Sequence, residues 1–129
     1  VNILNCMDTV IVPIAADKVI LESSLAFALK IQEWLTSGRT QVKEMYMLWN
    51  LVDAREKTDL YDQYEAIFEE YGLQTMQTKI PDTKKYRREG SKTLDRAVFR
   101  STVMPPDKTL LKGTRLPELT DELLGILKL

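Results

Sequence analysis

Two short and nearly uninterrupted apolar runs constrain the fold of this chain more than any other feature. One is Thr-Val-Ile-Val-Pro-Ile at residues 9–14, and the other is Met-Tyr-Met-Leu-Trp-Asn-Leu-Val at residues 45–52. Apolar residues that are continuous rather than alternating indicate a strand with both faces covered. Such strands are typical of parallel sheets, so we expect both runs to be buried strands of one.

A helix is expected after the first run. Asp17 is placed to cap it, and apolar residues then recur at helical spacing as far as about Ser37. Gly38 supplies the left-handed residue that commonly ends a helix. The first third of the chain is therefore expected to be one strand followed by one helix.

A second helix and a third strand are expected after the second run. Thr58 or Asp59 is expected to cap the helix, its apolar residues follow an i, i+4, i+7, i+8, i+11 spacing, and Gly72 closes it. Residues 73–80 then predict a strand, which Pro81 stops.

The part of the chain after this strand is expected to hold three short elements. They are a helical turn over residues 84–89, a strand or extended segment over residues 98–104, and a closing helix with Pro117 at its start. Asp121 and Glu122 are expected at the opening of this last helix, where negative charge suits the helix dipole.

Strands and helices thus alternate along the chain. This order predicts an α/β fold with a small, mostly parallel sheet of three to four strands, flanking helices and right-handed crossovers. A length of 129 residues with 44% hydrophobic residues suits a single domain, residues 1–129. Ligands of such sheets bind beyond the carboxyl ends of the strands. That rule selects the loop after Ile14, residues 50–57 and residues 81–88.

Several kinds of chemistry are excluded by what the chain lacks. It has no histidine and one cysteine, which excludes Ser-His-Asp and Cys-His catalysis, histidine-bound zinc and an internal disulfide. No glycine-rich phosphate-binding motif and no Gly-x-Ser-x-Gly motif occurs, so we expect no catalytic residue, no metal site and no nucleotide hydrolysis in this chain. Its apolar runs are too short to cross a membrane and no signal peptide is visible, which predicts a cytoplasmic location.

Asn50 and the pair Pro81 and Asp82 are the candidate binding residues. A side-chain amide both donates and accepts, so Asn50 could recognise the edge of a purine. From the spacing alone the more ordinary role, tying down the following turn, is favoured. Backbone groups after Pro81 could line a ring-shaped ligand, although residue type alone favours a simple end of the strand.

A basic segment follows these residues. Residues 82–100 contain seven basic and three acidic residues, a net charge of +4, while the rest of the chain carries −5. Lys84, Lys85, Arg87 and Arg88 could contact phosphates of a nucleic acid or an acidic partner. The ordinary alternative is a solvated surface.

Several motifs, in this order, resemble the C-terminal half of a ParA-type (deviant Walker, MinD-like) P-loop ATPase. They are Asp-Thr-Val-Ile-Val-Pro at residues 8–13, Asn-Leu-Val-Asp at 50–53, Ile-Pro at 80–81, Tyr-Arg-Arg-Glu-Gly at 86–90 and a closing helix at 116–129. The amino-acid sequence at residues 21–25, 49–50, 55–60 and 98–102 is most similar to that of ParA-like proteins of conjugative transposons. The resemblance implies that the sheet is the C-terminal half of a P-loop NTPase fold.

The resemblance also implies a function. Asn50 would recognise adenine, and the backbone at Pro81 and Asp82 would line the adenine ring. The full-length parent would be an ATPase that uses ATP with Mg²⁺, forms a homodimer, binds DNA non-specifically and works with a partition or transfer protein of a mobile DNA element. The alternative is a non-enzymatic module that binds DNA or protein through residues 84–100, or a small interaction domain that shares only the topology.

The resemblance further implies that these residues are a fragment. The chain begins with Val1 rather than Met, and the family's P-loop and metal-site aspartate would precede it; Asp8 is not that aspartate. The missing P-loop half would pack beside residues 9–14, so we expect an exposed sheet edge and an apolar helix surface. Exposed edges pair with other chains, and we expect the isolated chain to bind no nucleotide cofactor and to self-associate.

Overall fold

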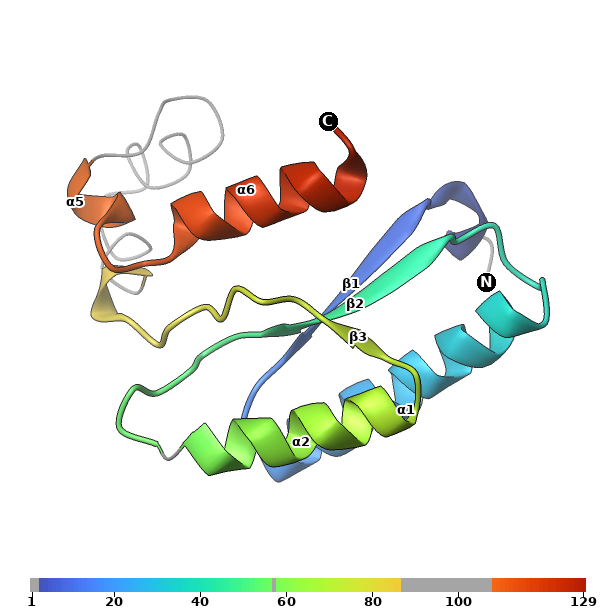
Figure 1. Cartoon of the computed structure of the whole chain (residues 1–129), viewed down its shortest axis with the longest axis horizontal. Helices are drawn as coiled ribbons and strands as arrows, with labels where there is room; N and C mark the ends of the chain where they lie inside the picture. The colour runs from blue at the N-terminus through green and yellow to red at the C-terminus, as the bar shows by residue number, and fades with distance from the viewer. Residues whose placement is uncertain (1–2, 57, 87–107) are drawn as a thin grey trace.

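The computed structural model describes residues 3–56, 58–86 and 108–129, which form an α/β fold with a small parallel sheet (Figure 1). The expected fold class is therefore confirmed. In chain order the elements are η1 (Leu4–Cys6), β1 (Thr9–Ile14), α1 (Lys18–Thr36), β2 (Glu44–Trp49), α2 (Thr58–Glu70), β3 (Gln74–Thr75), α5 (Lys108–Leu111) and α6 (Leu116–Leu127).

The sheet has the order β1-β2-β3, and both pairs of strands are parallel. β1 and β2 pair along their whole length, from Thr9 opposite Glu44 to Ile14 opposite Trp49. Helices α1 and α2 lie on one face of the sheet and α6 lies on the other (Figure 1). No helix in the described part of the chain is long and apolar enough to cross a membrane.

The core lies between the sheet and helices α1 and α2. Alternate residues of β1 and β2 are buried there, and the residues between them, which face α6, are mostly half-buried. Both faces of these strands are thus covered, as expected, but α6 covers its face incompletely, because it contributes no fully buried side chain. Aromatic rings fill the space under α2, with the centroid of Trp49 4.8 Å from Tyr61 and 6.0 Å from Phe68.

Helix α1 begins and ends where the sequence predicts. One carboxylate oxygen of Asp17 accepts hydrogen bonds from the backbone N–H groups of Val19 and Ile20, both at 3.0 Å. At the other end Gly38 has a φ of +67°, a left-handed conformation that would be strained for a residue with a side chain.

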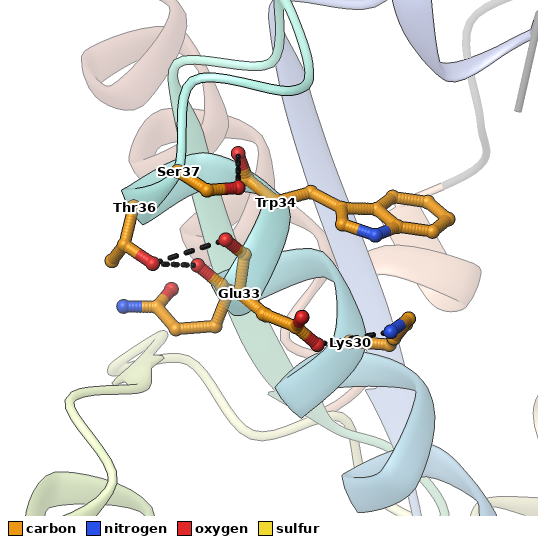
Figure 2. Close-up of polar contacts among 6 residues, drawn as sticks. Lys30, Glu33, Trp34, Thr36 and Ser37 are labelled. Atoms are coloured by element: carbon orange, nitrogen blue, oxygen red, sulfur yellow. Dashed lines mark hydrogen bonds and ion pairs between the residues drawn. The ribbon is translucent and has the colours of Figure 1, made fainter.

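Hydroxyl groups take up carbonyls of the last turns of α1 (Figure 2). Thr36 donates to the carbonyl of Gln32 at 3.0 Å, and Ser37 donates to that of Trp34 at 3.3 Å. The carbonyl of Trp34 also accepts the backbone N–H of Arg39 at 2.9 Å, so the Ser37 hydroxyl adds a second hydrogen bond there.

The second and third predicted strands are shorter in the structure. β2 ends at Trp49 rather than at residue 52, so Asn50 follows the strand instead of lying in it. The strand expected at residues 73–80 is reduced to β3 and a separate parallel bridge between Val52 and Pro81. At the break, the carboxylate of Glu122 in α6 accepts the backbone N–H groups of Gln77 and Thr78, a contact that no period in the sequence reveals.

The closing helix is confirmed with Pro117 in its first turn, but Asp121 and Glu122 lie in its middle and not at its opening. Helix α5 was not expected. Residues 84–86 are helical, while the rest of the predicted turn at 84–89 and the strand predicted at 98–104 lie outside the described residues.

β1 is an edge strand of the described sheet. The carbonyls of Asp8 and Ile14 accept hydrogen bonds from the residues of the β2 segment, so alternation directs the backbone groups of Thr9, Ile11 and Pro13 away from β2. Pro13 lacks an N–H, which is typical of an edge.

An apolar flank of α1 accompanies this edge. Ile20 is 40% exposed and Phe27 47% exposed on the flank of α1 that faces away from α2. On the opposite flank Gln32 donates to the carbonyl of Gly72, next to α2. We call the outward backbone of β1 together with Ile20 and Phe27 the open edge; it matches the exposed sheet edge and apolar helix surface that we expected.

Candidate functional site

The carboxyl ends of the strands meet at one edge of the sheet, as the parallel arrangement requires. The N–H of Asn50 donates to the carbonyl of Ile14 at 2.7 Å. The N–H of Val52 donates to the carbonyl of Ile80 at 3.0 Å, and the N–H of Asp82 donates back to Val52 at 2.9 Å. The three segments selected from the sequence are thus neighbours, and we call residues 14–17, 50–56 and 80–86 the rim.

Asn50 lies half-buried in the turn after β2. Its side-chain oxygen accepts a hydrogen bond from the N–H of Leu51 at 2.9 Å, and Leu51 has a φ of +54°, which is unusual for a branched side chain. This contact is the turn-stabilising role that the spacing alone favoured. Within the described residues the side-chain NH₂ group makes no hydrogen bond, so both of its donors and a second lone pair on the oxygen are available to a ligand.

Pro81 and Asp82 lie beside that turn. Pro81 pairs with Val52 through the parallel bridge and is half-buried, while Asp82 is exposed. The N–H of Asp82 is used by the sheet, so a ligand ring could meet this backbone through its carbonyls and its surface rather than through that donor.

Asp53 and Arg55 form an ion pair at the rim that sequence analysis missed. The carboxylate of Asp53 accepts hydrogen bonds from the backbone N–H of Arg55 at 2.9 Å, from Nε at 3.0 Å and from Nη2 at 2.8 Å. Hydrogen bonds from the Arg55 side chain, followed by the one from its backbone, lower the pKa of Asp53 to about 2. The signal in the sequence is the Asp-x-Arg spacing at residues 53–55.

The structure describes two of the four basic residues predicted to bind phosphate, Lys84 and Lys85, and their surroundings differ. Lys84 is exposed. The ammonium group of Lys85 donates to the carbonyls of Thr109 at 2.7 Å and of Lys112, so it stabilises the end of α5. Arg87 and Arg88 lie outside the described residues, and phosphate binding by these four residues stays a prediction.

Tyr86 anchors the same turn from the rim side. Its hydroxyl donates to the carbonyl of Thr114 at 2.7 Å, and burial raises the pKa of this phenol. Lys85 and Tyr86 therefore join the end of the rim to the segment that leads into α6.

Glu122 is the second residue that sequence analysis missed. From α6 its two carboxylate oxygens accept the backbone N–H groups of Gln77 at 2.6 Å and of Thr78 at 2.8 Å. Burial raises the pKa of Glu122, but the hydrogen bonds from Thr78 and Gln77 outweigh it, and the pKa lies below its ordinary value. No pattern in the sequence signals this contact, because 44 and 45 residues separate the partners.

No protein-family model matches this chain, and no curated protein and no solved structure matches it either.

Proposed function

We propose that this chain is the adenine-side, C-terminal part of a ParA-like ATPase that acts in partition or conjugative transfer of a mobile DNA element. The phosphate-binding half lies outside these 129 residues, and this part is not catalytic by itself. The observation that carries the proposal is the bridge between Val52 and Pro81, which puts the Asn50 turn beside the backbone of Pro81 and Asp82.

The free groups of Asn50 suit an adenine ring. The exocyclic amino group of adenine donates to the amide oxygen, and an adjacent ring nitrogen accepts from the amide NH₂. Guanine presents an acceptor where adenine presents that amino group, so it leaves the pair unmatched. ATP with Mg²⁺ supplies the triphosphate chemistry when bound, and the residues of this chain contribute recognition of the base.

The test is the nucleotide selectivity of the longer protein, which is translated from the coding sequence upstream of Val1 together with that of this chain. A bidentate amide–base pair contributes about 1–3 kcal/mol of discrimination, so Asn50→Ala is expected to reduce the preference for ATP over GTP by about 5- to 150-fold. Competition binding measures it. Asn5→Ala is the matched control, because Asn5 lies before β1 at the opposite edge of the sheet. Unchanged selectivity in Asn50→Ala would contradict the role of Asn50.

A simpler observation tests the assignment to the family. The coding sequence upstream of Val1 is expected to encode Gly-Lys-Gly-Gly-x-Gly-Lys-Thr at the end of a strand. An upstream sequence without a phosphate-binding loop would remove the proposal and leave the non-enzymatic binding module as the better explanation.

A further inference from the structure

The segment between β3 and the rim departs from a regular ladder by two residues. The N–H of Met76 donates to the carbonyl of Met47, and in an unbroken parallel ladder the N–H of Thr78 would be next, donating to Trp49. Instead, the N–H of Ile80 donates to the carbonyl of Trp49 at 2.8 Å. The stretch from Gln77 to residue 79 is therefore looped out of the sheet.

Glu122 supplies the acceptors that this excursion needs. Thr78 is only 4% exposed, so a backbone N–H left unpaired there would be costly. The carboxylate gives one oxygen to each of the two N–H groups at 77 and 78. A neutral amide in the same place has a single acceptor oxygen and could satisfy both groups only by sharing it.

The excursion and the turn after β2 together change the register at the rim by one residue. Two residues are looped out on the β3 side, and the left-handed turn at Leu51 adds one residue on the β2 side. β2 and β3 pair Met47 with Thr75, and an unbroken continuation of that register would place Ile80 opposite Val52. In the structure Pro81 is opposite Val52. The residues beside the Asn50 turn are thus selected by a segment that α6 holds from the other face of the sheet.

We propose that Glu122 is a positioning residue for the rim, whose carboxylate couples the docking of α6 to the placement of Pro81 and Asp82 beside Asn50. The identity of the ligand rests on the proposed function, whereas the coupling between α6 and the rim does not. Because such coupling is reciprocal, a ligand that needs this register also stabilises the docked position of α6.

The coupling is tested by hydrogen exchange of backbone amides in the whole chain without nucleotide. In Glu122→Gln we expect exchange to accelerate about tenfold or more at Gln77 and Thr78 and also at Val52 and Asp82, whose amides bond across the rim. Asp121→Asn is the matched control on the same helix, because Asp121 is exposed, and its rates should equal those of the unchanged chain. Acceleration confined to Gln77 and Thr78 would overturn the proposal.

A measurement on the unchanged chain covers the case in which the substitution prevents folding. In native-state exchange under mild denaturant, the amides of residues 77, 78, 52 and 82 are expected to open with one common free energy, below that of the β1–β2 ladder. Rim amides that open together with the β1–β2 ladder and apart from residues 77 and 78 would overturn the coupling.

Nucleotide binding distinguishes this proposal from the proposed function. In the longer protein Glu122→Gln is expected to weaken ATP binding while Asp121→Asn does not. Loss of selectivity in Asn50→Ala together with unchanged ATP affinity in Glu122→Gln would overturn the link to binding and keep the proposed function. An ineffective Asn50→Ala with coupled amide exchange would reject adenine recognition by Asn50 and keep the role of Glu122.

Discussion

At the scale of single residues, the roles of some side chains at the rim can be inferred from the sequence, and those of others only from the structure. Asn50 could be selected from the sequence because a polar residue at the end of an apolar run needs a partner. Lys85 looked like the other basic residues of its segment, yet its ammonium group is bound to carbonyls near α5. Residue type thus shows which contacts a side chain can make, while its partner depends on what the fold brings near it.

Asp53 provides a prediction at this scale. Its pKa of about 2 lies below the ordinary value of 3.8, so its contribution to stability is present above the ordinary pKa and is lost as the pH falls toward 2. Carbon NMR of the carboxyl group should show a midpoint near 2. In Arg55→Ala the midpoint should move up toward the ordinary value, because hydrogen bonding from the Arg55 side chain is the largest cause of the lowered pKa.

The control for this titration is Lys30→Ala, which removes an equally local ion pair with Glu33 on α1 and should leave the midpoint of Asp53 unchanged. A midpoint of Asp53 that is the same with and without the Arg55 side chain would show that the ion pair does not form in solution.

At the scale of elements, helix limits followed from the sequence better than strand limits did. Both ends of α1 agree with Asp17 and Gly38, and the end of α2 agrees with Gly72, because caps and left-handed glycines act locally. The start of α2 was predicted too late, because Thr58 and Asp59, expected as caps, lie inside the helix. The third strand was predicted too long, because alternation at Met76, Thr78 and Ile80 shows which side is buried but not where the backbone bonds go.

Two glycines allow a matched test of these local rules. Gly72 has a φ of +72°, so Gly72→Ala is expected to lower the free energy of unfolding by about 1–2 kcal/mol. Gly125 lies inside α6 with open space where a Cβ would stand, so Gly125→Ala is expected to raise it by about 0.5–1 kcal/mol. Urea denaturation of the two variants measures both, and effects of the same sign would contradict the assigned backbone conformations.

At the scale of the whole molecule, the open edge predicts self-association. The outward backbone of β1 and the exposed side chains of Ile20 and Phe27 form one uncovered surface in the described part of the chain. Sedimentation velocity is expected to show concentration-dependent association that Phe27→Glu weakens. Tyr71→Glu is the control, since Tyr71 is an exposed aromatic residue just after α2. A clean monomer at high concentration would count against the prediction.

The charge asymmetry predicts a second property of the whole molecule. If the basic segment binds DNA, affinity should fall steeply with salt, and Arg87→Ala combined with Arg88→Ala should reduce it and lower the slope of log K against log salt by about 0.9 per lost phosphate contact. Lys108→Ala combined with Lys128→Ala, two exposed lysines outside the segment, is the control of equal charge. Equal effects of the two double variants would mean that only net charge matters.

The sequence by itself determined the α/β class, the order of strands and helices and the carboxyl edge as the place to look for a site. Those properties depend on local spacing, on caps and on the rule that parallel strands end together. Only the tertiary structure decided that Glu122 of α6 bonds Gln77 and Thr78, and that Pro81 rather than Ile80 lies opposite Val52. A contact across more than forty residues leaves no periodic trace, because its partners are selected by packing and by the need to satisfy buried backbone groups.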